Sequence, residues 1–284
     1  MFRYKGLKLK EGDAALPKTR KELFKTIVRD DFYLLAEISV ILFLFSIPLA
    51  AGFILEVLMI THLPDLQGLF WVCFYSALIE IPLFGVRYIG RHAAFGVMKK
   101  RVQNEGGYIK ELFFQNLKKG FVKGFLAGCL VGFIAFLWQV GSIFVLTNDS
   151  TWIKGLGLGA TTLIFTMFYV AVEYFLSVDN FYELKFSGAL KNGLSFTIMH
   201  FPMSLVYFVA CVGVPFALTV ISPWAIFAFA AVMAFWGDGF TVLVATLYSH
   251  TLFDRYINSV YYPDYINKGL APREGEAEKE NDNG

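Results

Sequence analysis

Ionisable side chains interrupt several otherwise apolar stretches of this sequence. They are Glu56, Glu80, Glu173, His200 and Asp238. A charge at the centre of a lipid bilayer costs roughly 2.5–3.5 kcal/mol on insertion scales, so each such group is a candidate for binding a proton or a ligand. No nucleotide-binding loop, zinc motif or nucleophile elbow accompanies them, and we therefore expect a binding protein without a cofactor rather than an enzyme.

Glu80 begins a polar stripe within one apolar stretch. Arg87 and Arg91 follow it at spacings of seven and four residues, which keep all three side chains on one face of a helix. A carboxylate and two guanidinium groups so placed either pair with one another or receive a polar ligand. The alternative for the arginines is that they extend to lipid phosphates. For Glu80 and Glu173 the alternative is a fixed hydrogen bond between helices.

Asp238 lies in Trp236-Gly-Asp-Gly239, and a glycine on either side allows another helix to approach closely. We expect a protonatable or ligand-binding carboxylate here, and the alternative is a neutral aspartic acid bonded to a neighbouring backbone group. His200 precedes Pro202, which frees a backbone carbonyl one turn earlier. The histidine or a water is expected to satisfy that carbonyl inside the protein.

Four of these groups come from four different stretches, yet counting at about 1.5 Å of rise per residue places all of them in the inner half of the membrane. This common depth predicts a polar cavity that is open to the cytoplasm and binds a substrate or a proton. The predicted site consists of Asp238, Glu80, Glu173, His200, Arg87 and Arg91.

The composition indicates that lipid surrounds the elements that position this site. Hydrophobic residues make up 56% of the 284 residues and charged residues 17%, whereas a soluble domain has about 25% charged residues. The net charge of +2 gives no reason to expect nucleic-acid binding. The cysteines Cys73, Cys129 and Cys211 each lie in an apolar run, which argues against a disulfide framework or a metal site.

Six stretches are long and apolar enough to cross a bilayer, which takes about 20 residues. The uncharged region from Asn192 to Gly237 exceeds one span, and Ser222-Pro223 divides it where a turn is needed. The predicted fold is therefore an all-α, polytopic bundle of six transmembrane helices. The expected spans are Phe32–Met59, Leu66–Val86, Gly124–Leu146, Ile153–Leu176, Leu194–Val220 and Trp224–Leu252.

The loops predict the orientation, because lysine and arginine stay on the cytoplasmic side. They cluster before the first span and after the second, whereas Thr61–Asp65 and Thr147–Trp152 contain none. Both termini are therefore expected in the cytoplasm. The predicted organisation is a basic, amphipathic segment over 1–31, a membrane domain over 32–257 and a tail over 258–284 that is disordered after about residue 271.

Two charged segments next to the spans are amphipathic at helical spacing, namely Lys18–Val28 and Ile109–Phe121. Such helices lie on anionic lipid or dock a partner, and Leu112 and Phe113 are the expected docking residues of the second. A third segment contains Glu183 and Gly188 in an order that is similar to the cytoplasmic coupling loop of ABC importer permeases. That order predicts a contact with the soluble ATPase of such an importer.

Several short motifs over residues 79–257 resemble the YesL-like family of bacterial membrane proteins. They are Ile81-Pro82, the segment Gly106–Gly120, the segment Leu190–Pro202 and the segment Leu252–Ile257. The resemblance implies a multi-pass protein of the bacterial plasma membrane with a link to carbohydrate-uptake ABC transporters. We therefore expect an accessory subunit or a small carrier for a sugar or a similar polar solute. The alternative is a scaffold or regulator that binds a protein through its amphipathic cytoplasmic helices.

Overall fold

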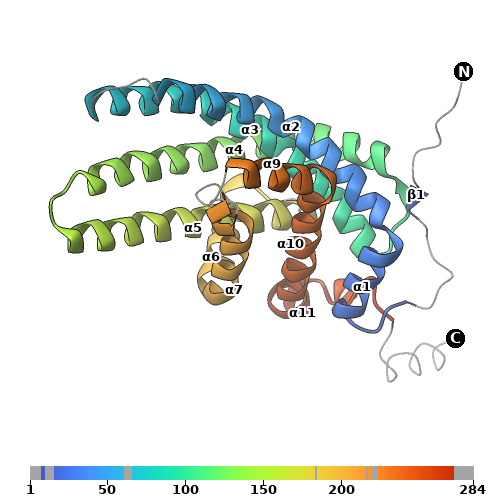
Figure 1. Cartoon of the computed structure of the whole chain (residues 1–284). Helices are drawn as coiled ribbons and strands as arrows, with labels where there is room; N and C mark the ends of the chain where they lie inside the picture. Colours follow the sequence, from blue (N-terminus) through green and yellow to red (C-terminus); the bar gives the residue numbers. More distant parts are fainter. Residues whose placement is uncertain are drawn as a thin grey trace, which may run out of the picture.

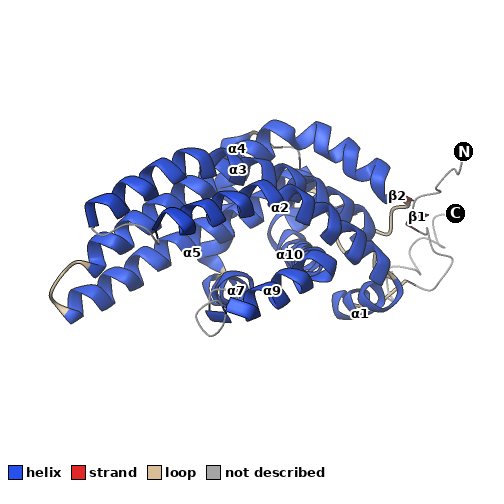
Figure 2. Cartoon of the chain, turned by 45° about the horizontal axis from the view of Figure 1, so that its top comes forward, coloured by secondary structure: helices blue, strands red, loops and turns tan. Residues whose placement is uncertain are grey.

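The computed structural model is built of helices, and it describes residues 8–9, 16–60, 66–182, 184–214, 217–218 and 223–271. Four long helices make up most of the first two thirds of the chain. They are α2 (Phe32–Ile60), α3 (Leu66–Val102), α4 (Ile109–Leu146) and α5 (Thr151–Tyr182). Figure 1 shows these helices running along the length of the molecule, and Figure 2 shows α4, α3 and α2 as neighbours.

Shorter and bent helices form the remainder of the described chain. The α-helices are α1 (Arg20–Asp30), α6 (Phe186–Met199), α7 (Phe201–Phe208), α9 (Pro223–Val232), α10 (Asp238–Phe253) and α11 (Ser259–Tyr261). The π-helical turns are η1 (Val209–Gly213), η2 (Met233–Gly237) and η3 (Asp254–Asn258), and η4 (Pro263–Tyr265) is a 3-10 turn. The two-residue strands β1 (Lys8–Leu9) and β2 (Gly107–Tyr108) pair antiparallel.

The described helices confirm the expectation of an all-α, multi-pass membrane bundle. Five of them are long and apolar enough to span a bilayer, and a bent pair, Phe186–Met199 with Phe201–Gly213, makes a sixth if it is one span. The five are Phe32–Ile60, Gly68–Val102, Ile109–Leu146, Thr151–Tyr182 and Ala228–Tyr261. The number of candidate spans therefore reaches the predicted six only through a broken helix.

The described part of the fifth predicted span, Leu194–Val220, is bent and not one straight helix. The axes of the two helices that meet at His200 differ by 98°. Pro202 stands at the start of α7, where its missing N–H group and the restricted residue before it end one helix and begin another. A π-turn also separates α9 from α10, and Figure 1 shows these two helices running in different directions, as π-turns often cause.

The packed core lies at one end of the bundle. Leu23, Ile38, Phe95 and Phe253 are all buried there, and the end also holds the turn between α3 and α4. We call it the basic end, because the last turn of α3 contains lysine and arginine. At the opposite end, near the α4–α5 turn, Trp152 and its apolar neighbours are exposed, as expected for side chains that face lipid.

Helix α1 packs on the protein rather than lying on lipid as an interfacial helix. Its residues Leu23 and Ile27 are buried, and the ring of Phe24 lies edge-on to Phe240 of α10, with 5.7 Å between the ring centres. The prediction that this apolar face binds the membrane surface is therefore wrong. Likewise, the second amphipathic segment continues without a break into the span and forms α4.

The last described residues fold back onto the basic end. Lys268 forms a 2.8 Å ion pair with Glu105, and the N–H group of Ala271 donates to the carbonyl of Pro17. The start of the predicted tail, from residue 258 to residue 271, is thus packed on α1 and the α3–α4 turn. The predicted disorder after residue 271 lies outside the described residues.

Candidate functional site

Close packing of α3 on α4 fixes the direction in which the polar stripe of α3 points. A side chain at Gly128 would place its Cβ atom 2.3 Å from the carbonyl oxygen of Phe84. Only a glycine permits this approach between helices. With this face of α3 occupied by α4, the stripe that contains Glu80, Arg87 and Arg91 is turned toward an interior cavity.

This cavity has a volume of about 530 Å³ and lies among α3, α4, α5 and η1, with Phe53 of α2 at its edge. We call it the stripe cavity. Its walls are largely aromatic, while its polar groups come from three helices. The polar and charged lining residues are Glu80, Arg87, Arg91, Gln139 and Thr162, and the aromatic ones are Phe53, Phe84, Tyr88, Trp138, Phe165, Tyr169 and Phe208.

Arg91 forms a buried ion pair with Glu173 of α5. Its Nε atom lies 2.8 Å from Oε1 and 3.0 Å from Oε2, and the two side chains are 5% and 3% exposed. A second guanidinium nitrogen donates to the hydroxyl oxygen of Tyr207 at 3.0 Å, and that hydroxyl donates to Glu173 at 3.3 Å. Glu173 is thus held in a fixed interaction between helices, in agreement with the alternative interpretation of the sequence.

Asp238 faces both arginines without a direct hydrogen bond to either. Its Oδ1 atom lies 3.7 Å from a nitrogen of Arg87 and 3.8 Å from a nitrogen of Arg91. Among the described residues this oxygen has no hydrogen-bond partner, although the side chain is 7% exposed. Both distances exceed hydrogen-bond length, so a small polar group is able to bridge these charges.

The glycine after Asp238 allows the close approach that its neighbours predicted. A Cβ atom at Gly239 would lie 2.4 Å from the carbonyl oxygen of Leu35 in α2, and the Gly239 N–H group donates to Ser39 Oγ at 2.8 Å. This contact anchors the start of α10 against α2. It therefore positions Asp238 opposite the arginines of α3.

Arg87, Arg91, Glu173 and Asp238 form a group that we call the arginine cluster. Its positive and negative charges balance, but the exposure of its side chains differs. Two guanidinium groups, on Arg87 and Arg91, meet two carboxylates, on Glu173 and Asp238. The side chain of Arg87 is 35% exposed, whereas that of Arg91 is 5% exposed. Arg87 is thus the accessible cation of the cluster and does not simply extend to lipid phosphates, because Asp238 lies beside it.

Glu80 lies apart from this cluster and pairs with another acid. Its carboxyl group interacts with that of Glu56, which also accepts two hydrogen bonds of 3.4 Å from the amide of Gln139. This contact joins α2 to α3. The predicted single site is therefore divided. Glu80, Arg87 and Arg91 line the stripe cavity, whereas Glu56, Glu173 and Asp238, which face them, are not among its lining residues.

His200 is not part of the arginine cluster, contrary to its predicted place in the site. It stands at the sharp bend between α6 and α7, where its ring lies 6.3 Å from that of Tyr248 and 5.7 Å from that of Tyr256. It lines neither the stripe cavity nor the smaller cavity beside it in the described part of the chain. The bend explains why the sequence placed His200 in the site. The prediction assumed one straight helix over this span, which would give the His200 side chain a different direction.

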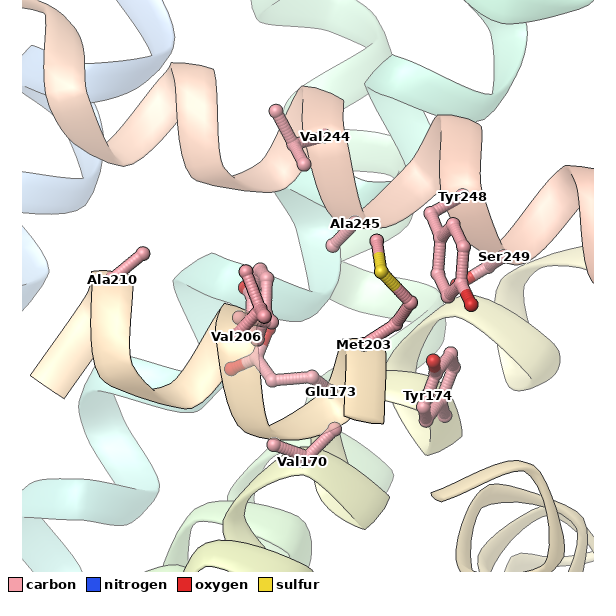
Figure 3. Close-up of a pocket in the computed structure, with 11 residues that line it drawn as sticks. Val170, Glu173, Tyr174, Met203, Val206, Ala210, Val244, Ala245, Tyr248 and Ser249 are labelled. Atoms are coloured by element: carbon pink, nitrogen blue, oxygen red, sulfur yellow. The ribbon is translucent and has the colours of Figure 1, made fainter. Parts of the chain in front are cut away.

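A smaller cavity of about 190 Å³ adjoins the cluster between α5, α7 and α10. Figure 3 shows Val244, Ala245 and Tyr248 of α10 facing Met203 and Val206 of α7 across it. Glu173 contributes to this smaller cavity, while its partner Arg91 lines the stripe cavity. The ion pair consequently lies between the two cavities.

Sequence reasoning missed the tyrosines that complete the cluster. Tyr88 donates to Glu173 at 3.4 Å, and Tyr207 contacts both members of the ion pair. Tyr88 precedes Arg91 by three residues and therefore shares its helix face. That spacing was a usable signal, whereas nothing local marks Tyr207, which reaches the pair from α7.

The expected partner-docking residues of the second amphipathic segment are buried. Leu112 is 7% exposed and Phe113 is fully buried, with its ring 6.1 Å from that of Phe45. The prediction that these two side chains dock a partner is therefore wrong, because α2 and the turn before α4 already cover them. No atom lies within 4 Å of a Cβ atom added at Gly188, and Glu183 lies outside the described residues.

Comparison with known protein families gives a match to part of the chain. Residues 35–142 are similar to a family described as protein of unknown function, DUF624. The matched stretch contains Glu80, Arg87 and Arg91, and it overlaps the part of the chain that resembles the YesL-like family. No curated protein and no solved structure matches the chain.

Proposed function

We propose that this membrane protein binds a polar, hydroxyl-rich solute in the stripe cavity and takes part in solute transport, with a carbohydrate as the solute class. The observation that carries the proposal is that Arg87 and Arg91, which line the stripe cavity, both face Asp238 at distances beyond hydrogen-bond length. A solute hydroxyl group placed there accepts from a guanidinium and donates to the carboxylate. The Oδ1 atom of Asp238 thereby gains the hydrogen bond that it lacks among the described residues.

The walls of the cavity suit the apolar faces of a sugar ring. Trp138 and Phe165 stack with 5.6 Å between ring centres, and the indole N–H of Trp138 donates to Thr162. Small-molecule sites combine mostly apolar and aromatic walls with a few polar groups, in volumes of about 300–1,000 Å³. The stripe cavity, at about 530 Å³, lies within that range.

The broken helix beside the cavity supports a role in transport. Cys211 and Gly213 of the π-turn η1 line the stripe cavity, and η1 follows the 98° bend between α6 and α7. Discontinuous helices frequently form the substrate sites of membrane carriers, because their helix ends and unwound backbone groups face the bound solute. The resemblance to the YesL-like family supports a bacterial plasma membrane and a place beside an ABC importer, as its accessory subunit or as a small carrier.

The scaffold alternative has less support, because Leu112 and Phe113 are buried. It now depends on the exposed surface around Gly188 of α6. Loss of a co-purifying ATPase in a Gly188→Trp variant that still binds solute would favour that alternative.

Thermal unfolding of the full chain in a neutral detergent tests the proposal against a panel of mono- and oligosaccharides. A bound solute at 100 times its Kd stabilises the folded state by about 2.7 kcal/mol. We expect Arg87→Gln and Asp238→Asn to abolish that gain, and Glu111→Gln, an exposed acid on α4, to keep it. If no sugar stabilises the protein and both cavity variants import sugar normally in cells, the proposal is wrong.

A further inference from the structure

The contact between Glu56 and Glu80 follows from a close approach of α2 to α3. A Cβ atom added at Gly52 would lie 3.2 Å from a side-chain carbon of Leu83 and 3.5 Å from Cγ of Glu80. Glu56 comes one turn after Gly52, so the same face of α2 presents its carboxyl group to Glu80. Glu56 is 3% exposed and Glu80 is 4% exposed. We call these two buried residues the acid pair.

No basic side chain of the described residues balances the charge of the acid pair. Neither carboxyl group has a lysine or an arginine as a partner in that part of the chain, and Glu56 instead accepts from the neutral amide of Gln139. Arg87 shares a face of α3 with Glu80, but it lies two turns further along and faces Asp238. Adjacent carboxylates without a counter-charge are costly inside an apolar segment, and a bound cation removes that cost.

Two buried oxygen atoms on the same face of α3 have no hydrogen-bond partner among the described residues. They are Oε1 of Glu80 and Oγ of Ser76, and Ser76 is 4% exposed. Ser76 stands one turn before Glu80, and Cys73, three residues earlier, contacts Glu56. The Ser76 hydroxyl therefore lies between two side chains that both contact Glu56, and it is directed to the acid pair. Buried oxygens without partners are costly, so these two atoms point to a ligand.

Helix α4 closes the third side of this space. Gln139 contacts Glu56, and Ser142, three residues later on the same helix face, also has a hydroxyl oxygen without a partner among the described residues. Glu80 and Gln139 both line the stripe cavity. An ion in that cavity is therefore able to reach the acid pair.

We propose that the acid pair binds a monovalent cation, which is either a sodium ion or a proton. One positive charge between the two carboxylates offsets their repulsion, and carboxylate and hydroxyl oxygens are the donors that hard cations take. Within the described residues no three His, Cys, Asp or Glu side chains converge to hold a metal ion, which favours a single charge over a multivalent metal. The site differs from the solute site in the residues that form it and in the charge of its ligand.

The sodium arm of the test measures the thermal midpoint of the full chain in neutral detergent without sugar. It compares sodium chloride with choline chloride at equal ionic strength. We expect sodium to raise the midpoint, because an ion that binds only the folded state stabilises it. Glu80→Gln keeps the shape of the side chain and removes one carboxylate, so it should abolish this response. Glu111→Gln, which alters an exposed acid on α4, should retain it.

The proton arm records the infrared spectrum of the same protein in choline chloride near neutral pH. A proton held by the acid pair gives the carbonyl band of a protonated carboxyl group, which an ionised carboxylate lacks. Glu56→Gln and Glu80→Gln should each shift or remove this band, whereas Glu111→Gln should leave it in place. A sodium response identifies sodium as the ligand, and the band without a sodium response identifies a proton.

Two buried serines give a matched control for the direction of Ser76. Ser76 and Ser177 both have a hydroxyl oxygen without a partner among the described residues, but Ser177 belongs to α5, one turn beyond Glu173. Where sodium is the ligand, Ser76→Ala should weaken its apparent affinity about tenfold, and where a proton is the ligand it should shift the band. Ser177→Ala should change neither signal.

The proposal is overturned if the unaltered protein shows neither a sodium response nor the band of a protonated carboxyl group. It is also overturned if the signal that appears persists unchanged in Glu80→Gln. Both measurements are made without sugar, so their failure is distinct from a failure of the proposed solute binding.

Discussion

The guanidinium of Arg91 and the carboxylate of Glu173 join α3 to α5 through two contacts, at 2.8 Å and 3.0 Å, in a setting almost closed to solvent. A pair this well matched has little capacity left for a ligand. It fixes the wall between the two interior cavities. The adjustable charges of the cluster are therefore Arg87 and Asp238, which meet only at 3.7 Å.

Glu173→Leu is expected to destabilise the protein severely. It leaves the guanidinium of Arg91 buried without its carboxylate, and breaking a buried pair from one side costs about 3–5 kcal/mol. The double variant Arg91→Leu with Glu173→Leu removes both charges and is expected to recover much of that loss. Chemical unfolding in detergent measures both free energies. A single variant as stable as the unaltered protein would show that the pair is not structural.

Gly128→Ala is expected to destabilise the contact between α3 and α4. The added Cβ atom would lie 2.3 Å from the Phe84 carbonyl oxygen, and such overpacking costs about 1–3 kcal/mol. Gly155→Ala is the matched control on α5, because no atom lies within 4 Å of a Cβ at that position. Thermal unfolding of the two variants should separate them, and equal midpoints would contradict the tight packing described for α4.

Phe113→Ala and Phe114→Ala should differ sharply in stability. Phe113 is fully buried and Phe114 is 56% exposed, and truncating a buried phenylalanine costs about 3–5 kcal/mol. The comparison tests whether the apolar face of this segment is core or a docking surface. If Phe113→Ala keeps full stability and loses a co-purifying partner, Phe113 would be a docking residue and not part of the core.

The ion pair between Lys268, near the end of the described chain, and Glu105 of the α3–α4 turn should weaken in acid. Burial alone would raise the pKa of Glu105, but hydrogen bonds from Lys268 and Lys100 hold that pKa below its ordinary value of 4.5. Because the pKa of Glu105 is lowered in the folded state, its contribution to the free energy of unfolding is complete above about pH 4.5. That contribution is lost as the pH falls through the pKa of the folded state. The side chain of Glu105 is 35% exposed, and solvent screening therefore keeps the effect under about 1 kcal/mol.

Comparison of Glu105→Gln with the unaltered protein across this pH range checks the expectation. The difference in unfolding free energy should be present near neutral pH and should vanish in acid. Glu111→Gln, which alters an exposed acid in the first turn of α4, serves as the control. A difference for Glu105→Gln that persists unchanged in acid would show that another interaction is responsible.

The sequence predicts the helices of this protein better than their partners. Spacings of seven and four residues place Glu80, Arg87 and Arg91 on one face, and all three do line one cavity. The same periodicity carries no information about which helix lies opposite. It therefore gave no means of assigning Glu80 to Glu56, or Arg91 to Glu173, both of which are contacts between distant parts of the chain.

The wrong predictions for the apolar face of α1 and for the place of His200 have the same cause, because the sequence does not show which elements pack together. The apolar face around Leu23 and Ile27 is visible in the sequence, but its composition is equally suited to lipid and to the protein core, and the structure buries it in the core. The bend at His200 depends on Pro202, and a proline within an apolar stretch either kinks a helix or divides it. Composition alone does not separate those outcomes.

Tryptophan fluorescence gives the most direct test of solute binding in the stripe cavity, because Trp138 is the tryptophan of its lining. Titration of the purified full chain with the sugar that stabilises it should change the emission to saturation. Trp138→Phe should remove that change while thermal stabilisation persists, and Arg87→Gln should abolish both. An emission change that survives Trp138→Phe, or binding that is undiminished in Arg87→Gln, would contradict the placement of the solute in this cavity.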